Sequence, residues 1–387
     1  MGTCNVCGAE ATEFAALLNL PIYCNLLWDD RQAAIDCPKG DIRLAFCSNC
    51  GGISNTVFDP YRLGYSQDYE NSLHYSPRFQ QYATNLAQRL VKKHDLHRKT
   101  IVEIGCGKGD FLVSLCELGD NKGIGFDNSY VERDEHLNRH VTFIQDFYSE
   151  KYAHYRADFV CCRQVLEHVQ RPNDLLLPLK KALGEGTAFF EVPNALYTFE
   201  NMMVWDIIYE HCTYFTPVSL AYTFAVAGFE TSEVREEFAG QFMSIEGVRC
   251  DGERRAIADS TAVQSLHQTI ETFASRFAQQ QSQWRSSLEA MFSAGKKVVI
   301  WGSGSKGVTF LNLLKLKEIH YAIDINPRKQ GKYIPGSGQA IVAPEQMRDY
   351  RPDVVIVMNP LYKQEIEQSL IALGLGAQVM TTAEVSN

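Results

Sequence analysis

Two segments that lie far apart in the chain share one pattern, in which an apolar run enters a glycine-rich turn and then a helix-like stretch. The first joins residues 100–104 to glycines at 105–109, and the second joins residues 297–301 to glycines at 302–307. A buried strand that enters a helix through such a turn is typical of a parallel α/β sheet, which binds ligands beyond the carboxyl ends of its strands. The predicted fold class is therefore α/β, with two such units.

Charge and apolar pattern exclude several classes of protein. The chain has 387 residues, 37 Lys and Arg against 46 Asp and Glu, and a formal net charge of −9. It has no block of basic residues that could bind a phosphate backbone, so no nucleic-acid partner is expected. No apolar run approaches the ~18 residues of a membrane span, and the first ten residues lack the regions of a secretory signal. We therefore expect a cytoplasmic protein of two or three domains with no membrane partner.

Four of the twelve cysteines form two C-x-x-C turns, at Cys4, Cys7, Cys47 and Cys50. Two such turns can present four thiolates to one tetrahedral zinc ion, which fixes a small domain that has little apolar core. Four thiolates leave no open coordination position, so the predicted metal is structural. The alternatives are chance turns or a redox dithiol, but a glycine directly follows each turn, which is typical of a metal knuckle.

Acidic residues accompany the first glycine turn and the strands after it. Strands are predicted at 100–104, 122–126, 141–144, 158–161 and 187–192, with helices at 110–118 and 173–183. The compact G-x-G-x-G turn with an acid just before it is typical of a site for S-adenosylmethionine (SAM). Asp127, at the end of the second strand, would bind the ribose hydroxyls, and Asp146 the adenine amino group. The predicted cofactor-binding residues are Glu103, Gly105, Gly107, Asp127, Asp146 and Gln164.

The second glycine turn matches G-x-G-x-x-G, with Asp324 at the spacing of a dinucleotide site. Alone it would indicate NAD, whereas the alternative is that the glycines let a helix pack closely on the sheet. No residues suited to hydride chemistry accompany the turn, which disfavours NAD. Between the two units, residues 253–294 contain neither Gly nor Pro and carry apolar residues at helical spacing. They are predicted to form one long bridging helix, or two helices, with an apolar packing face.

Several motifs are similar to those of one known family. They lie at 4–8, 47–51, 102–109, 191–193, 210–215, 304–307 and 324–336. On these motifs the chain resembles the three-domain, zinc-containing, SAM-dependent C-methyltransferases known from the biosynthesis of antibiotic deoxysugars. The resemblance covers nearly the whole chain in the same order, and the last motif is the most specific.

The chain is accordingly divided into four parts. We expect a small zinc-binding N-terminal domain, a central Rossmann-like class I methyltransferase domain, a helical linker and a C-terminal Rossmann-like domain. Their predicted bounds are 1–70, 71–252, 253–295 and 296–387.

The resemblance also implies a mechanism. A nucleotide-linked keto sugar loses a proton beside its carbonyl, and the resulting enolate carbon takes the methyl group of SAM. By resemblance His211 is the general base, and Glu210 and Tyr209 orient it or stabilise the enolate. A tyrosine that follows the N-terminal domain, Tyr75 or Tyr69, also reaches the site. An unperturbed imidazole pKa near ~6.5 suits a base that operates at neutral pH; the alternative is that His211 is a hydrogen-bonded structural histidine.

The pair Glu167 and His168, after the fourth strand, competes with His211 for the role of base, although it is interpreted as lining the cofactor cleft. The chain also departs from the sugar enzymes at two places. Tyr209 lies one residue closer to the Glu-His pair than their tyrosine, and residues 239–246 lack their His-Gly-Gly-Ser-type segment. A different acceptor therefore stays open.

The predicted function is that of a SAM-dependent C-methyltransferase of a nucleotide-linked keto-deoxysugar, with Lys306 and Lys332 positioning the nucleotide. One alternative is a C-, N- or O-methyltransferase of another small natural-product acceptor. The other is a non-catalytic adaptor that binds SAM or NAD. The intact set Tyr209, Glu210 and His211 weighs against an adaptor.

Overall fold

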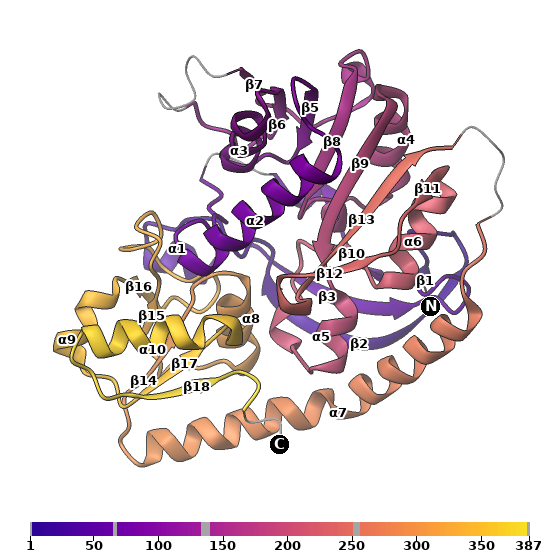
Figure 1. The fold of residues 1–387 in the computed structure, drawn as a ribbon. Coiled ribbons are helices and arrows are strands. Elements are labelled where there is room, and N and C mark those ends of the chain that lie inside the picture. Colours follow the sequence, from indigo (N-terminus) through magenta and orange to yellow (C-terminus); the bar gives the residue numbers. More distant parts are fainter. Residues whose placement is uncertain (1, 65–67, 133–139, 251–255, 385–387) are drawn as a thin grey trace.

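The computed structural model describes residues 2–64, 68–132, 140–250 and 256–384, which form three sheets and a long helix (Figure 1). The predicted α/β fold class is confirmed, with the two α/β sheets placed where the glycine turns indicate. None of the described helices combines the length and the apolar character that a membrane span requires.

The N-terminal sheet is antiparallel, in the order β1-β2-β3-β4-β10. Its strands are β1 Gly2–Thr3, β2 Glu10–Pro21, β3 Lys39–Phe46, β4 Ile53–Asn55 and β10 Thr213–Tyr214, and helix α1 Arg31–Ile35 lies between β2 and β3. In β3, Ile42 and Leu44 are buried while Asp41 and Arg43 are exposed, the alternation of a strand with one covered face. The last strand, β10, comes from the central part of the chain and pairs with β4.

The central sheet has the order β11-β13-β9-β8-β5-β6-β7, and β12 pairs with β13. Its strands are β5 Thr100–Ile104, β6 Lys122–Phe126, β7 Val141–Ile144, β8 Ala157–Arg163, β9 Leu183–Pro193, β11 Phe229–Thr231, β12 Arg235–Glu237 and β13 Phe242–Arg249. Strands β5 to β9 run parallel, and β13 is antiparallel to its neighbours. All five strands predicted for this unit are present, and β8 and β9 are longer than expected.

Helices cover both faces of the central sheet. They are α2 Pro77–Lys93, α3 Asp110–Gly119, α4 Asn173–Ala182 and α6 Pro217–Val226, whereas the short helix α5 Ala195–Glu200 belongs to the apolar cluster of α7 and the N-terminal sheet. One apolar cluster joins α2 and α3 to one face, and a second joins α4 and α6 to the other. Local sequence begins these helices: Ser76 caps α2 ahead of a proline, and Thr216 forms a capping box with Ser219 in α6.

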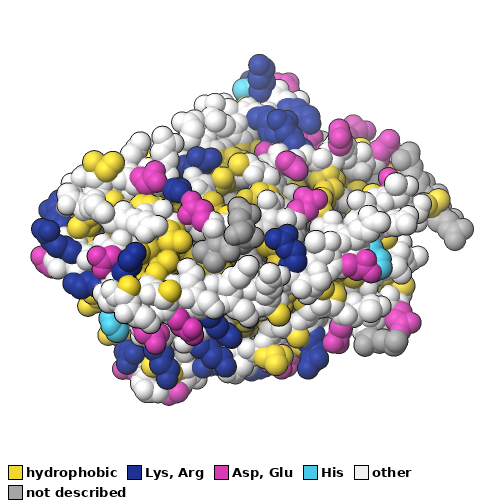
Figure 2. Space-filling view, turned by 90° about the horizontal axis from the view of Figure 1, so that it is seen from below, with side chains coloured by type: hydrophobic (Ala, Val, Ile, Leu, Met, Phe, Trp, Pro, Cys, Tyr) yellow, Lys and Arg dark blue, Asp and Glu magenta, His cyan; other side chains and the backbone are white. Residues whose placement is uncertain are grey.

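Helix α7, Ser260–Ser293, is one continuous helix of 34 residues, about 51 Å long. This result selects the first of the two predicted arrangements, and residues 253–255 of that prediction lie outside the described residues. Asp259 caps the helix, and its buried face, from Val263 to Leu288, belongs to the same apolar cluster as the N-terminal sheet and the C-terminal unit. Figure 2 shows the side on which α7 lies, where basic and acidic side chains are interspersed.

The C-terminal sheet is wholly parallel, in the order β16-β15-β14-β17-β18. Its elements are β14 Val298–Trp301, α8 Ser305–Leu314, β15 Tyr321–Ile323, β16 Ala340–Val342, α9 Met347–Tyr350, β17 Val354–Val357, α10 Lys363–Ala372 and β18 Gln378–Thr381. Trp205 from the central part, Trp284 of α7 and Phe310 of α8 stack edge to face, which joins the three parts in one core.

Candidate active site

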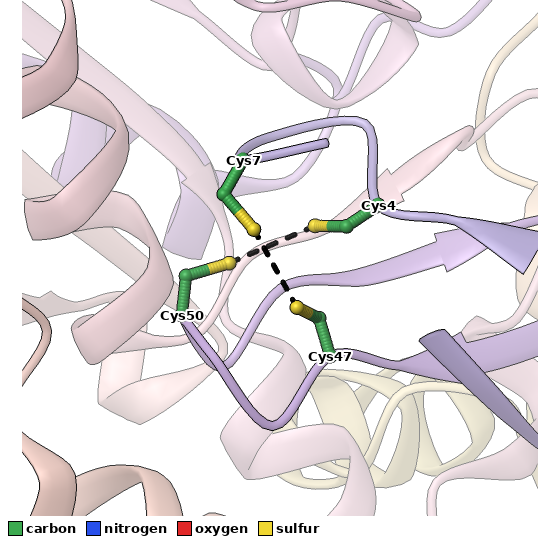
Figure 3. A group of neighbouring side chains, drawn as sticks. All are labelled: Cys4, Cys7, Cys47 and Cys50. Carbon is green, nitrogen blue, oxygen red and sulfur yellow. Dashed lines mark hydrogen bonds between the residues drawn. The ribbon is translucent and has the colours of Figure 1, made fainter. Parts of the chain in front are cut away.

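The four cysteines of the two C-x-x-C turns converge on one point (Figure 3). The sulfur of Cys4 lies 3.6 Å from that of Cys50, and the sulfur of Cys7 lies 3.5 Å from that of Cys47. Four thiolates bound to one zinc ion at ~2.3 Å would lie about 3.8 Å apart, so the observed spacing fits zinc. The glycine after each turn has a positive φ, +75° and +71°, which glycine adopts without strain. The cluster therefore fits a zinc-binding unit.

The first glycine turn lies between β5 and α3 and needs its glycines for two reasons. Gly105 has a φ of +70°, and a Cβ on it would lie 2.1 Å from Cγ2 of Val165. Gly107 has a φ of +54°, and a Cβ on it would meet nothing within 4 Å, so open space lies beside the turn. The Gly107 N–H donates to Oδ2 of Asp127 at 2.8 Å. The turn thus connects the end of β6 to the segment that follows β8.

Asp127 and Asp146 lie in different surroundings. Oδ1 of Asp127 accepts from the backbone N–H and the hydroxyl of Ser129, both at 2.7 Å. With the bond from the glycine turn, this uses three of the roughly four acceptor positions of a carboxylate, so one remains for a ligand hydroxyl. Asp146 instead accepts from Lys151 and Tyr152, and these two hydrogen bonds lower its pKa to about 2. Asp146 is therefore already engaged by its own loop.

Glu103 and Gln164 belong to a polar network below the turn. Burial raises the pKa of Glu103 to about 8, against the lowering effect of Arg163, and its Oε2 has no hydrogen-bond partner among the described residues. Gln164, with a φ of +56°, donates to Oε1 of Glu191 at 3.1 Å, as Arg163 does at 3.2 Å. The unpartnered Glu103 oxygen, the acceptor position on Asp127 and the space beside Gly107 together fit an adenosine-type ligand.

A cavity of about 340 Å³ lies where the three parts of the chain meet. Its lining includes Tyr69, Tyr75, Gln164, His211, Lys306 and Asn326. The glycines of the first turn are not among the lining residues, but Val165, which meets Gly105, directly follows Gln164. The cavity therefore lies next to the predicted cofactor turn, as an acceptor site requires.

His211 lines this cavity from the segment just before β10. Pairing of β10 with β4 holds this segment against the N-terminal sheet. The His211 ring packs edge to face on His168, at 4.9 Å between ring centroids, and on Tyr214 at 5.9 Å. Burial lowers the pKa of His211 well below its usual value, and the charges of His168 and Lys306 lower it further. The imidazole is therefore neutral at neutral pH and has a lone pair that can accept a proton.

Glu210 points away from the cavity, into the N-terminal part. Its carboxylate is fully buried and accepts from the backbone N–H of Cys24 at 2.9 Å. Burial raises the pKa of Glu210 to about 7, and hydrogen bonds from Cys24 and Tyr69 oppose this rise. The backbone oxygen of Glu210 accepts from Nδ1 of His168 at 3.0 Å. Glu210 thus reaches the cavity through Tyr69 and His168, which suits a positioning role.

Tyr209 is not among the residues that line the cavity. Its ring is 1% exposed and lies so close to Gly40 that a Cβ there would be 2.4 Å from it, and its hydroxyl accepts from the N–H of Asp59 at 3.1 Å. Ile208, one residue earlier, lines the cavity instead. The expectation that Tyr209 orients the base or stabilises an enolate therefore needs correction, because the one-residue shift turns this side chain toward the N-terminal sheet.

Both tyrosines proposed from the segment after the N-terminal domain line the cavity. Tyr75 is 38% exposed and lies at its rim, whereas Tyr69 is 7% exposed and bonds with Glu210. Tyr69 also accepts from Nδ2 of Asn25 at 3.5 Å. Tyr69 is therefore the deeper of the two, and its one O–H is engaged with Glu210.

The pair Glu167 and His168 lies in the same cavity as His211, which the sequence does not indicate. Both belong to the short helix η4, Leu166–His168. Burial raises the pKa of Glu167 to about 8 and lowers that of His168 to about 4. The Cys212 N–H bonds to the carbonyl of Glu167 at 2.9 Å, which links η4 to the segment that carries His211. Only the fold reveals this proximity.

The second glycine turn faces the cavity from the other side. The backbone N–H and hydroxyl of Ser303 donate to Asp324, so this acid closes its own turn as Asp127 closes the first. Lys306 lines the cavity and pairs with Asp206. Lys332 pairs with the exposed Asp29 and is not among the residues that line the cavity, so the structure does not bring Lys332 together with Lys306.

Known families match the two α/β parts of the chain. Residues 75–234 match the family described as a methyltransferase domain, and residues 255–380 match the family described as the C-methyltransferase C-terminal domain. These matches describe a methyltransferase domain that is followed in the chain by a C-methyltransferase C-terminal domain. Its central domain has the class I methyltransferase fold.

Curated relatives agree with this assignment. The chain is 28% identical to the C-methyltransferase NovU of Streptomyces niveus over 225 residues, which cover 55% of this chain and 54% of that protein. It is 27% identical to the mitochondrial ubiquinone biosynthesis O-methyltransferase of Dictyostelium discoideum over 122 residues, which cover 26% of this chain and 38% of that protein. The matches thus span about half or less of the length of these relatives.

Solved structures that resemble the chain are also methyltransferases. One is the 1,6-didemethyltoxoflavin-N1-methyltransferase of Burkholderia thailandensis with S-adenosylhomocysteine, at 15% identity and a TM-score of 0.35, covering 45% of this chain and 82% of that one. Another is the magnesium protoporphyrin IX methyltransferase of Synechocystis, at 15% identity and a TM-score of 0.36. This match covers 44% of this chain and 84% of that one.

Proposed function

We propose that the protein is a SAM-dependent C-methyltransferase that deprotonates a carbon beside a ketone and methylates it. The observation that carries the proposal is the neutral imidazole of His211, which lines a cavity next to the first glycine turn. A carbon acid needs a base before it can act as a nucleophile, and a buried neutral imidazole can take its proton. The four-cysteine cluster is proposed to hold structural zinc, and a cytoplasmic location stays a prediction.

The residues divide the chemistry among them. SAM would be held by Gly105, Gly107 and Asp127 and would supply an electrophilic methyl group. His211 accepts the proton from the acceptor carbon, and the electron pair of the broken C–H bond moves into the enolate. Tyr69 has one O–H, which it donates to Glu210 when no acceptor is bound. When the acceptor binds, this O–H would turn from Glu210 to the oxygen where negative charge develops, which lowers the energy of the transition state. Glu210 orients Tyr69 through its carboxylate and His168 through its backbone oxygen.

The proposed acceptor is a nucleotide-linked keto-deoxysugar. A cavity of about 340 Å³ suits a small polar molecule rather than a polymer. The second glycine turn and Lys306 line its far side, where a basic side chain and backbone N–H groups can meet phosphate oxygens. The relative NovU, by its name, is also a C-methyltransferase.

A different acceptor is the alternative that the structure keeps open. Gln241 and Phe242, in the stretch where the chain departs from the sugar enzymes, line the cavity. Gln241 also exchanges two hydrogen bonds, each of 2.9 Å, with Asn359 of the C-terminal unit. This amide pair belongs to the cavity wall, where it would contact the acceptor. The non-catalytic adaptor is disfavoured, because an adaptor has no need of a neutral imidazole beside the cofactor turn.

Solvent exchange measured by mass spectrometry tests the proposal. The protein and SAM are incubated in deuterated water with a panel of nucleotide-linked ketosugars. We expect a product heavier by one methyl group, and deuterium beside the ketone of recovered acceptor. His211→Gln should abolish both while S-adenosylhomocysteine still binds, and His267→Ala, which changes an exposed histidine of α7, should leave both unchanged. Methylation that persists in His211→Gln would exclude His211 as the base and favour an N- or O-acceptor.

A further inference from the structure

Glu167, His168 and His211 form a second group of metal-ligating side chains, separate from the cysteines. Each offers one ligand atom, and these atoms lie within 4.8 Å of one another. Nε2 of His168 lies 3.9 Å from Oε1 of Glu167. A tetrahedral ion with bonds of ~2.1 Å needs ligand atoms about 3.4 Å apart, a spacing that small side-chain rotations would reach.

The surroundings of this group favour a cation over a hydrogen-bonded cluster. Nδ1 of His168 lies 3.0 Å from the carbonyl oxygen of Glu210, which can only accept, so the proton is on Nδ1 and the lone pair is on Nε2. A backbone carbonyl behind the ring is the usual second contact of a metal-bound histidine. Oε2 of Glu167 has no hydrogen-bond partner among the described residues, although the side chain is 2% exposed. A buried carboxylate oxygen without a donor is one that an ion would satisfy.

We propose that Glu167, His168 and His211 bind a divalent transition metal such as Zn²⁺, and that this ion inhibits the enzyme. Two imidazoles and one carboxylate select Zn²⁺, Co²⁺ or Ni²⁺ over Mg²⁺ or Ca²⁺, which prefer oxygen ligands. The open side of the cavity leaves room for a water molecule as a fourth ligand. The inhibition rests on the proposed function, because the ion would occupy the lone pair with which His211 takes the acceptor proton.

Metal stoichiometry of the full-length protein, purified without a polyhistidine tag, tests the site without any activity assay. We expect wild-type protein to bind two equivalents of Zn²⁺, of which a mild chelator removes only the second. Glu167→Gln and His168→Gln should each weaken the second equivalent by at least about tenfold and keep the first. His267→Ala is the matched control, because it removes an exposed His–Glu pair of α7 and should leave both equivalents unchanged.

Cobalt separates the two sites by their ligands. The second equivalent of Co²⁺ should add ligand-field bands without further thiolate-to-cobalt charge transfer, and Mg²⁺ should not compete with it. Binding of S-adenosylhomocysteine shows that each variant is folded. A single equivalent in wild type, or a second one that survives both Glu167→Gln and His168→Gln, would overturn the site.

In the methylation assay the second equivalent should inhibit and the chelator should restore activity. If the second equivalent binds but does not inhibit, the regulatory role is overturned. If protein without the second equivalent does not methylate the acceptor, this counts against the proposed function and leaves the metal site unaffected.

Discussion

The first glycine turn contains two glycines that are needed for different reasons, and substitution separates these reasons. Both have a positive φ, +70° at Gly105 and +54° at Gly107. A Cβ at Gly105 would also lie 2.1 Å from Val165, whereas a Cβ at Gly107 would meet nothing within 4 Å. Gly105→Ala therefore adds overlap to backbone strain, and Gly107→Ala adds strain alone.

The two effects have different magnitudes. A non-glycine residue in the left-handed region costs about 1–2 kcal/mol, and overpacking of a tight site costs about 1–3 kcal/mol more. We expect Gly107→Ala to lower the free energy of unfolding of the central domain by about 1–2 kcal/mol and Gly105→Ala by about 2–5 kcal/mol. For a domain of this size each kcal/mol lowers Tm by about 2–4 °C.

Thermal unfolding and hydrogen exchange of the peptide 100–119 would measure these losses, with Val165→Ala combined with each variant. Removing the two methyl groups of Val165 relieves the overlap at Gly105 but has no effect on strain. The double variant Gly105→Ala/Val165→Ala should therefore be more stable than the sum of its single changes by at least about 1 kcal/mol. The pair with Gly107→Ala should be additive. Equal losses at Gly105 and Gly107, or additivity in both double variants, would refute the reasoning.

Three further predictions concern other parts of the molecule. Cys47→Ser should reduce bound structural zinc from one equivalent per chain to less than about a tenth, while Cys250→Ser, outside the cluster, keeps it; metal analysis distinguishes them. Tyr209→Phe removes the acceptor of a backbone N–H, so it should cost about 0.5–1.5 kcal/mol of stability and leave kcat within about twofold; a hundredfold loss would restore its catalytic role. Burial would raise the pKa of Glu246, but hydrogen bonds from His94 and Lys93 lower this pKa to about 2. The ionised carboxylate therefore stabilises the fold above about pH 4.5, and this contribution is lost as the pH falls toward 2. Denaturant unfolding of Glu246→Gln should show a deficit against wild type that disappears over this range.

The C-terminal α/β unit could be predicted from the sequence because its central strands are buried on both faces. Residues 298–301 and 354–357 are apolar throughout and fully covered, so the run itself marks the strand. The positive φ angles of the glycines mark where each strand enters its helix. The N-terminal sheet could not be predicted in this way, because its last strand has two residues and comes from position 213.

The candidate site was predicted only in part. His211 could be named from the motif, and the structure places it in the cavity. The sequence also names His168, as a residue of the cofactor cleft, but it does not predict the contact of His168 with His211. The two rings meet because η4 contacts the segment before β10, and no local sequence pattern records that contact. The motif also predicts a role for Tyr209, but one residue of difference decides which side of the chain a side chain faces. Here that position is held by Ile208.

The two cysteine turns, which we propose bind zinc, and the proposed base are connected through the N-terminal sheet. Cys47 and Cys50 form the turn between β3 and β4, β4 pairs with β10, and β10 directly follows the segment of His211. The Asn55 N–H also bonds to the carbonyl of Cys212 at 3.0 Å. Loss of the metal should therefore loosen this segment while the first glycine turn, which lies in another sheet, stays intact.

Chelation tests this connection without an acceptor. Zinc-depleted protein should lose hydrogen-exchange protection in residues 210–216 as well as in the cysteine turns, and should bind S-adenosylhomocysteine with an affinity within about threefold of the zinc-bound form. Restoring one equivalent of zinc should restore the protection. Protection at 210–216 that survives depletion, while the cysteine turns open, would show that the N-terminal sheet positions His211 without help from the metal.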